Sequence, residues 1–231
     1  MTTAIFAIRP EPGCTATVIA GRAFGLTIEA CPLFEIRSLS WNPPPAERID
    51  ALLLGSANAI RHGGPALAAF RGKPAYAVGD ATAAEAEAAG FPIAATGRGG
   101  LQSLLNEAAA EPLRLLRLAG TEHVPLAPPP GVEIETRFAY DAVPLPLPET
   151  VAARLHFGGL VLLHSAAAVR HFASECDRCG IARSGIGLVA LGPRIAEAAG
   201  EGWGELRAAA EPREAALLAL ARDMCHEPPL R

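Results

Sequence analysis

Two serines occupy the same kind of position, directly after an apolar run and before residues that favour a helix. Ser56 lies in "LLLGSANAIRH" and Ser165 in "LVLLHSAAAVRH". A serine at such a corner can act as a nucleophile, hold an anion together with backbone N–H groups, or cap the helix. The nucleophile hypothesis is the weakest for Ser56, because its segment lacks the second glycine of a G-x-S-x-G turn and no motif supplies a base.

The two serine segments belong to an internal repeat. Four blocks recur in the same order, with "SANAIRH" (56–62) matching "SAAAVRH" (165–171), "AVGDATAAEA" (77–86) matching "ALGPRIAEAA" (190–199), "GLTIEACPLFEI" (25–36) matching "GVEIETRFAYDA" (131–142), and "AIFAIRP" (4–10) matching "RLLRLAG" (114–120). The blocks keep the same order, and each lies at nearly the same distance in sequence from its match. This predicts two copies of one structural unit.

Short apolar runs alternate with alanine-rich segments along the chain. The runs are rich in Val, Ile and Leu and predict strands buried on both faces, over residues 4–8, 51–54, 75–78, 115–118, 160–163 and 187–191. The alanine-rich segments predict helices, for example over 82–90 and 194–202. Alternation of this kind predicts an α/β fold with parallel sheets.

Composition excludes several classes of function. The chain has 231 residues, half of them apolar, and a formal net charge of −4, which gives no electrostatic footprint for nucleic acid or a membrane surface. The first apolar run is too short for a signal peptide, and no run reaches the ~18 residues of a membrane helix. Five scattered cysteines fit a reducing compartment, so a cytoplasmic protein is expected.

Cys176 and Cys179 have the spacing of metal ligands. No second C-x-x-C pair or histidine pair completes a four-ligand zinc site in this sequence. The preferred interpretation is two thiols near the end of a helix that stops before Gly180, and no metal is expected.

Eight segments, taken in order, resemble the uroporphyrinogen-III synthase family, which closes the tetrapyrrole ring in haem biosynthesis. Their order and spacing over residues 4–221 carry the resemblance, through "IRPEPG", "CPLFEI", "DALLLGSANAIR", "AYAVGDATAAEAEAAGF", "VEIETRFAYDAVP", "GLVLLHSAAAVRHF", "LVALGPRIAEAA" and "AAEPREAALLALA".

The resemblance implies two similar α/β lobes, each a parallel sheet flanked by helices, joined by two extended connections around a cleft that holds the active site. The expected first lobe comprises residues 1–36 and 144–231, and the second comprises 40–140, with crossovers at 36–40 and 140–144. Proline runs at 42–45 and 144–148 fit extended connections, because proline cannot continue a helix or a central strand.

The resemblance also implies a reaction. The family's substrate is hydroxymethylbilane, a linear tetrapyrrole with eight carboxylates, which loses water, inverts its last pyrrole ring through a spiro intermediate and closes. Unaided, the same substrate closes without the inversion. The implied enzyme is a cyclising lyase that needs no cofactor, acts as a monomer, contacts neither nucleic acid nor membrane, and can receive its substrate by transient handover from hydroxymethylbilane synthase.

Substrate carboxylates can be held by the unpaired N–H groups at helix N-termini. The expected binding residues lie at strand-to-helix corners of the repeat and at the end of the first strand, namely Ser56, Ala57, Asn58, Thr82, Ser165, Ala166, Gly192, Pro193, Arg194 and Arg9. Simple capping is the alternative for the serines, and Thr82 opens a Thr-x-x-Glu85 pattern typical of a capping box. A surface salt bridge is the alternative for Arg9.

Tyr140 is the expected catalytic residue. The resemblance maps it onto the family's tyrosine at the return crossover, where a phenol can help the substrate hydroxyl leave as water. A packed aromatic is the alternative, since the repeat places Phe34 at the equivalent position. His62 and His171, six residues after each serine, are expected on helix surfaces.

The sequence departs from the family pattern in two places. Arg194-Ile195 stands where small hydroxyl residues are common, and "TEHV" after Gly120 lacks a common basic residue. The sequence leaves two other functions as alternatives. A bilobed binding protein without catalysis is the main alternative, and a nucleotide-binding enzyme is weaker because no G-x-G-x-x-G follows the first strand.

Overall fold

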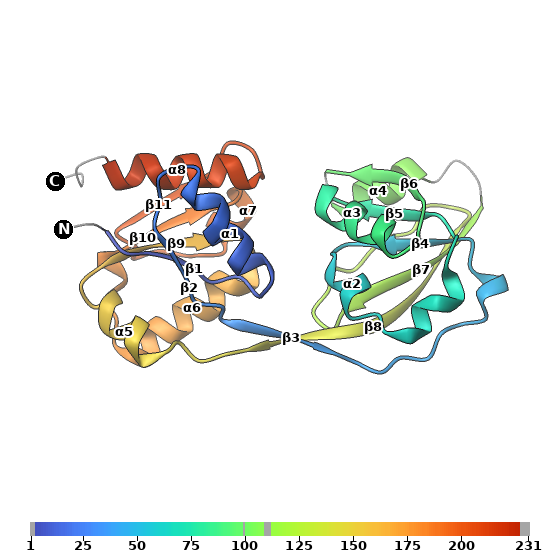
Figure 1. The fold of residues 1–231 in the computed structure, drawn as a ribbon, viewed down its shortest axis with the longest axis horizontal. Helices are drawn as coiled ribbons and strands as arrows, with labels where there is room; N and C mark the ends of the chain where they lie inside the picture. Colours follow the sequence, from blue (N-terminus) through green and yellow to red (C-terminus); the bar gives the residue numbers. More distant parts are fainter. Residues whose placement is uncertain (1–2, 99, 109–111, 227–231) are drawn as a thin grey trace. The chain divides into compact units, whose positions relative to one another are not determined.

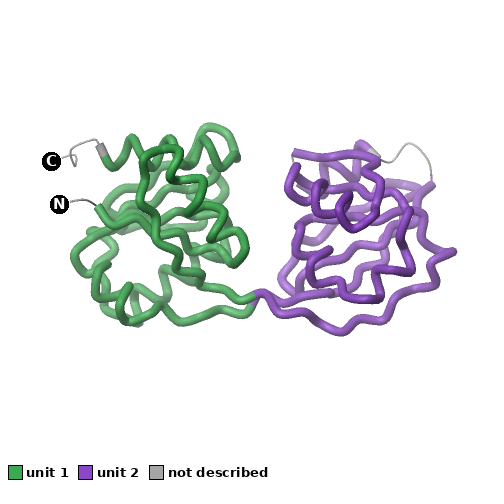
Figure 2. Tube along the Cα trace, in the orientation of Figure 1, with its two compact units in different colours: residues 1–35, 143–231 green, residues 36–142 purple. Residues whose placement is uncertain are grey.

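The computed structural model describes residues 3–98, 100–108 and 112–226, and the chain divides into two compact units. Unit 1 comprises Met1–Glu35 and Val143–Arg231, and unit 2 comprises Ile36–Ala142 (Figure 2). The chain therefore passes from one unit to the other twice. Each unit alternates strands with helices, as the sequence predicts (Figure 1).

Unit 1 contains a five-stranded sheet in the order β11-β10-β9-β1-β2, with every pairing parallel. Its strands are β1 (Ile5–Ala7), β2 (Ile28–Ala30), β9 (Gly159–Leu163), β10 (Ile186–Ala190) and β11 (Glu205–Ala208). The N-terminal strands β1 and β2 pair into the sheet built by the C-terminal half, so both ends of the chain are needed to complete this unit.

The helices of unit 1 are α1 (Gly13–Arg22), α5 (Glu149–Leu155), α6 (Ala166–Cys179), α7 (Pro193–Glu197) and α8 (Glu214–His226), with a 3-10 turn at Arg183–Gly185. Residues of α1 and α8, including Cys14, Leu217 and Leu218, form one buried core with apolar residues of the sheet. Helix α6 ends where Gly180 adopts a left-handed conformation with φ +68°, which confirms the predicted helix end.

Unit 2 contains a six-stranded sheet in the order β3-β8-β7-β4-β5-β6. Its strands are β3 (Phe34–Ser38), β4 (Ala51–Leu54), β5 (Ala75–Val78), β6 (Ile93–Gly97), β7 (Leu113–Gly120) and β8 (Val132–Pro144). The pairings from β8 through β6 are parallel. Strand β3 lies at the edge beside β8, where the Leu39 N–H donates to the Ala139 carbonyl at 2.8 Å.

Helices cover both faces of the unit 2 sheet. They are α2 (Asn58–Arg61), α3 (Asp80–Ala88) and α4 (Leu101–Ala108), with 3-10 turns at Ala46–Arg48 and Pro65–Phe70. Residues of α2 and α3 share one core with Phe70, Leu116 and Leu118, whereas Leu105 of α4 packs in a second core with Leu115. None of the helices in the described ranges is long and apolar enough to cross a membrane.

The six predicted strands are all present, and the helix predicted over 82–90 is found as α3. The helix predicted over 194–202 ends early at Glu197, because Gly200 and Gly202 follow with positive φ values. Strands β2, β3, β6, β8 and β11 are absent from the predicted set. Each of them is short or contains charged and small residues among its apolar ones, as β8 does, so their apolar signal is weak.

Candidate functional site

The predicted residues of unit 2 gather at one edge of its sheet. Because β8, β7, β4 and β5 are adjacent and parallel, their carboxyl ends meet at the same edge. Ser56 follows β4, Gly79 follows β5, and Tyr140 lies near the end of β8 opposite Gly120 of β7. Such an edge is where parallel α/β sheets bind their ligands.

Tyr140 is held with its phenol ring against the backbone of β7. The pairing shifts register between Ala119 and Gly120, and a Cβ atom at Gly120 would lie 2.7 Å from Cε2 of the ring. The ring is partly buried and packs against the core shared by α2 and α3. The packed-aromatic alternative therefore describes its ring correctly, and leaves open what its hydroxyl does.

Burial raises the pKa of the Tyr140 phenol above its ordinary value. Hydrogen bonds from the Ser56 side chain and from the Gly120 backbone, and the charge of Arg117, act in the opposite direction without cancelling the effect of burial. The phenol therefore stays protonated through the neutral range and is a proton or hydrogen-bond donor.

Ser56 plays a different part from the one that capping predicts. Helix α2 is capped by Ala57 and begins at Asn58. The Asn58 N–H donates to the Ser56 Oγ at 3.2 Å, and the same hydroxyl lowers the pKa of Tyr140. Ser56 thus connects the turn after β4 with the phenol, and Ala57 and Asn58 lie beside it in the same turn.

The prediction that Thr82 caps a helix is wrong. Helix α3 begins at Asp80, and its N-cap is Gly79, whose φ of +80° suits glycine. Thr82 lies inside the first turn, 5% exposed, and its N–H donates to the Gly79 carbonyl at 3.1 Å. The capping-box prediction fails as well, because Glu85 pairs with Arg61 at 2.5 Å. The turn from β5 into α3 is therefore formed by Gly79 and Asp80.

The predicted residues of unit 1 also share a sheet edge. Strands β1, β9 and β10 are adjacent and parallel, and they are followed by Arg9, Ser165 and Gly192. Ser165 is the N-cap of α6, whose first residue is Ala166, and its Oγ accepts from the Ala168 N–H at 3.1 Å. The capping prediction for Ser165 is confirmed, and it is compatible with anion binding at the same turn.

Gly192 is the N-cap of the short helix α7, which opens on Pro193. Pro193 has no N–H, so it contributes no backbone donor to this corner. Pro193 and Arg194 are exposed while Gly192 is buried. After Gly192, the first backbone N–H donor of this corner therefore belongs to Arg194.

Arg9 takes part in a polar network that also includes the first residue of α8. Arg9 Nη1 lies 3.4 Å from Glu214 Oε2, His164 Nε2 lies 3.0 Å from the same oxygen, and Thr17 Oγ1 donates to Oε1 at 2.6 Å. Burial raises the pKa of Glu214, but His164, Thr17 and Arg9 together bring it below its usual range. The salt-bridge alternative for Arg9 is thus what the structure contains.

Two histidines expected on helix surfaces instead touch the segments that join the units. His62 is half-buried, and its Nδ1 lies 3.0 Å from Ser38 Oγ on β3. His171 Nε2 donates to the Leu145 carbonyl at 2.7 Å, and its ring meets Phe34 edge-on at 5.1 Å. The surface prediction is corrected for both, because contacts with β3 and with Leu145, just after β8, give no signal in the sequence spacing.

Arg117 is a further buried charge near Tyr140. It lies on β7, 5% exposed, and its guanidinium donates to the Val124 carbonyl at 2.8 Å, while its Nε has no partner among the described residues. Burial lowers its pKa, and the field of Tyr140 opposes that shift. A single arginine inside an apolar strand gives little sequence signal. The sequence pattern therefore does not identify Arg117 as a site residue, and it does not identify His164 or Glu214 either.

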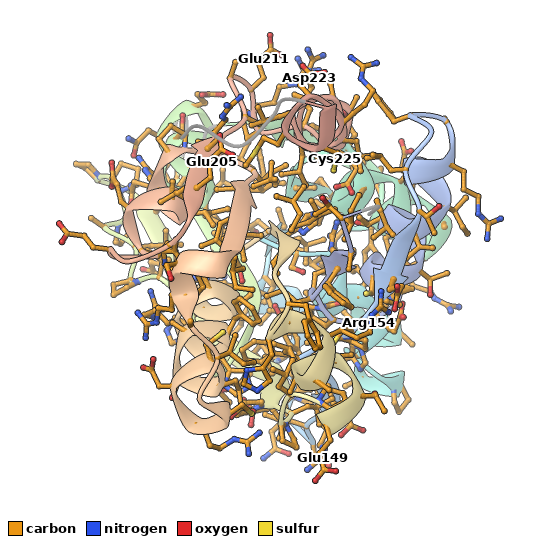
Figure 3. All side chains as sticks on the ribbon, turned by 90° about the vertical axis from the view of Figure 1, so that its left-hand side faces the viewer. Glu149, Arg154, Glu205, Glu211, Asp223 and Cys225 are labelled. Atoms are coloured by element: carbon orange, nitrogen blue, oxygen red, sulfur yellow. The ribbon has the colours of Figure 1, made fainter. Side chains whose placement is uncertain are left out.

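The cavity of about 740 Å³ in unit 1 lies at the other edge of the sheet. Its lining includes Gly159, Ile186 and Glu205 at the amino ends of β9, β10 and β11, with Arg154 and Cys225 at the face shown in Figure 3. None of the predicted site residues lines it. Its position at the amino ends of the strands separates it from the edge that carries Ser165.

Metal chemistry gains no support from the described part of the chain. Its residues contain no group of three His, Cys, Asp or Glu side chains that could hold an ion. Cys176 and Cys179 occupy the last turn of α6, and burial raises the pKa of Cys176 to about 12, so its thiol is not a reactive one at neutral pH.

Comparison with known proteins matches this fold to one family. A solved uroporphyrinogen-III synthetase from Helicobacter pylori has a TM-score of 0.64 at 16% identity, covering 96% of this chain and 99% of that one. A mutant uroporphyrinogen III synthase from Thermus thermophilus has a TM-score of 0.54 at 16% identity, covering 97% and 100%. No curated protein matches the sequence significantly. The model of the family described as uroporphyrinogen-III synthase HemD matches residues 16–219, and the chain therefore belongs to the uroporphyrinogen-III synthase family.

Proposed function

We propose that the protein is a cyclising hydro-lyase that converts hydroxymethylbilane to uroporphyrinogen III. Water leaves the terminal hydroxymethyl group, the last pyrrole ring inverts through a spiro intermediate, and the macrocycle closes. The observation that carries the proposal is the protonated Tyr140 phenol at the carboxyl edge of the unit 2 sheet, beside the Ser56 turn, in a chain of this family.

Tyr140 supplies the proton donor that loss of water requires. Hydroxide leaves a carbon atom poorly, and protonation in the transition state converts it to water, which typically accelerates such a step by ~10²–10⁴-fold. Hydrogen bonds with Ser56 and with the Gly120 backbone hold the phenol oxygen at this strand end, and we propose that its O–H reaches the substrate hydroxyl. The raised pKa keeps this proton in place until the hydroxyl departs.

The substrate carboxylates are held at the strand ends of both units. In unit 2 the turn at Ser56, Ala57 and Asn58 offers N–H groups, and in unit 1 the N-terminus of the 14-residue helix α6 at Ser165 and Ala166 does the same. Gly192 and Arg194 form a third corner, and Arg9 adds a charge. We propose that these edges bind one substrate in an interlobe cleft, which fixes the geometry that inverts the ring.

We further propose how the whole chain is organised and where it acts. The first lobe is 1–36 with 144–231, the second is 40–140, and the segments at 36–40 and 140–144 are the crossovers that join them. The enzyme acts as a cytoplasmic monomer without a cofactor and takes its unstable substrate from hydroxymethylbilane synthase by transient handover.

Product analysis tests this function against binding without catalysis. Hydroxymethylbilane is generated in the presence of the protein, and the oxidised isomers are separated. The proposal predicts mainly type III. A binding protein without catalysis would retain the substrate and leave the product as type I.

A further inference from the structure

His62 stands beside Tyr140 and has no role in the function proposed above. It follows α2 directly and lies at the same sheet edge as Ser56. Its ring centroid is 6.2 Å from that of Tyr140, with the planes inclined at 45°. The two rings are therefore close neighbours at the edge where the substrate is proposed to react.

Two side-chain contacts fix the end of α2 that carries His62. Ser38 Oγ lies 3.0 Å from His62 Nδ1, and Trp41 Nε1 donates to the Gly63 carbonyl at 2.8 Å. Trp41 is itself stacked on the buried Phe70, with ring centroids 6.3 Å apart. A helix of only four residues would not hold a side chain by itself, but these contacts fasten it to the chain that leaves β3.

Gly63 makes this tight turn possible. A Cβ atom there would lie 2.2 Å from Leu67 Cδ1 and 2.7 Å from the Ala59 carbonyl oxygen, so only glycine fits. The segment after α2 therefore has one close-packed path, and His62 is presented at its start.

The charges around His62 favour its neutral form. Burial and the charge of Arg61 lower the pKa of the imidazole below its ordinary 6.5. Arg61 is paired with Glu85 of α3 at 2.5 Å, Tyr140 of β8 is protonated, and the contact from β3 is the uncharged Ser38. At neutral pH the ring can therefore accept a proton.

We propose that His62 is a second catalytic residue of the Tyr140 site and accepts the proton that ring closure releases. In the tautomer whose Nδ1–H donates to Ser38 Oγ, Nε2 carries the lone pair and is the atom that accepts the proton. This inference rests on the proposed function, since it assigns the second proton transfer of the same reaction.

The two proton transfers, from Tyr140 and to His62, balance over one reaction cycle. Tyr140 gives its phenolic proton to the hydroxyl, the carbon–oxygen bond breaks, and water and a pyrrole-stabilised cation form. The cationic carbon bonds to the substituted α-carbon of the last pyrrole ring and gives the spiro intermediate, whose older bond between that α-carbon and its bridging carbon then breaks to leave a second pyrrole-stabilised cation. Closure joins this second cationic carbon to the unsubstituted α-carbon of the inverted ring, and the hydrogen on that α-carbon leaves as a proton to His62 Nε2. Transfer of this proton to the Tyr140 phenolate restores both residues, and the net products are the macrocycle and water.

The test measures kcat, KM and their pH dependence for type III formation in His62→Gln. We expect kcat to fall by ~10²-fold or more while KM changes little, because a general base acts only in the chemical step. Wild-type kcat should fall as pH drops through the pKa of His62, which lies below its ordinary value, and this decline should be missing in the variant. An unchanged kcat and pH profile in His62→Gln would overturn the inference.

Two further variants, His62→Phe and the control His156→Gln, distinguish a role of His62 in proton transfer from a role in packing. His62→Phe keeps a ring against Tyr140 and should be as slow as His62→Gln, whereas wild-type activity in His62→Phe would show that the ring only fills space and would also overturn the inference. If His62→Gln does not fold, His62→Phe decides the question. The exposed His156 provides the matched control, and His156→Gln should behave as wild type.

The proposed function can fail independently of this inference. Wild-type protein that yields only type I product would refute the function itself. Wild-type protein that yields type III, together with fully active His62 variants, would refute only the role of His62.

Discussion

Tyr140 and Gly120 face each other across the β7–β8 pair so closely that a methyl carbon on Gly120 would lie 2.7 Å from the phenol ring. Real side-chain carbons do not approach that closely. The missing side chain at Gly120 therefore creates the place where the Tyr140 ring lies, and the Gly120 N–H reaches its oxygen. The position of the proposed proton donor depends on this one glycine.

Gly120→Ala should displace the ring and damage catalysis. Overpacking of this kind costs about 1–3 kcal/mol of unfolding free energy, and a donor moved by an ångström loses much of its rate advantage. Thermal unfolding and type III turnover measure the two effects. Gly185→Ala is the control, because the nearest atom to a Cβ there is 3.9 Å away and φ is not positive. Equal activity of both variants would contradict the proposed geometry.

Tyr140→Phe removes the phenolic oxygen and keeps the ring. We expect kcat for type III to fall by ~10²–10⁴-fold, while the unfolding free energy changes by about 1 kcal/mol or less. Stopped or quenched assays on fresh substrate give the rate, and chemical denaturation gives the stability. Near-normal turnover to the inverted isomer would show that Tyr140 is not the acid.

Variants of Arg9 and Glu214 distinguish a substrate-binding role of Arg9 from a structural one. If its charge holds a substrate carboxylate, Arg9→Gln should raise KM by roughly tenfold, the effect of losing one charged hydrogen bond. Glu214→Gln breaks the same 3.4 Å ion pair but leaves the arginine charge in place. KM that rises only in Arg9→Gln supports binding, and equal KM values in all three proteins would assign Arg9 to the Glu214 network alone.

Glu175 should make stability depend on pH. It is 7% exposed and lies 2.6 Å from both the Arg178 guanidinium and the Leu147 N–H. Arg178 lowers the pKa of this carboxyl most, burial opposes the shift, and Leu147 adds to the lowering. Because the folded-state pKa is lowered, the carboxylate stabilises the fold above its unfolded pKa of about 4.3, and this contribution is lost as pH falls through the folded value.

Glu175→Gln tests this linkage by denaturant unfolding at pH 7 and pH 3. The stability difference between the two pH values should be smaller in the variant than in the wild type, because one acid-sensitive group is gone. Glu201→Gln, at an exposed position, should keep the wild-type difference. A Glu175→Gln protein with the full wild-type pH dependence would contradict the assignment.

The parts of the fold predicted from sequence are those with strong local signals. Strand β4 is fully buried and reads as an uninterrupted apolar run, and the repeat at Ser165 correctly predicts a capped helix. The capping prediction for Thr82 fails because its pattern competes with Gly79, which can adopt a positive φ and starts the helix earlier. Local patterns thus succeed where no stronger competitor lies nearby.

Tertiary contacts account for the rest. His62 looked like a surface residue because a one-turn helix cannot reveal that Ser38, 24 positions earlier, meets its ring. The coupling of Arg9 to Glu214 spans 205 positions and needs the last helix to return to the first strand. The sequence contains these residues but not their distances, and only the folded chain shows which of them meet.

The isomer ratio formed from hydroxymethylbilane at increasing protein concentration tests the proposed function most directly. Spontaneous closure gives type I, so an enzyme that competes with it must raise the fraction of type III as its concentration rises. We predict that type III approaches the whole product for the wild-type protein and that Tyr140→Phe needs far more protein to reach the same fraction. A product that stays type I at every concentration of folded wild-type protein would contradict the proposal.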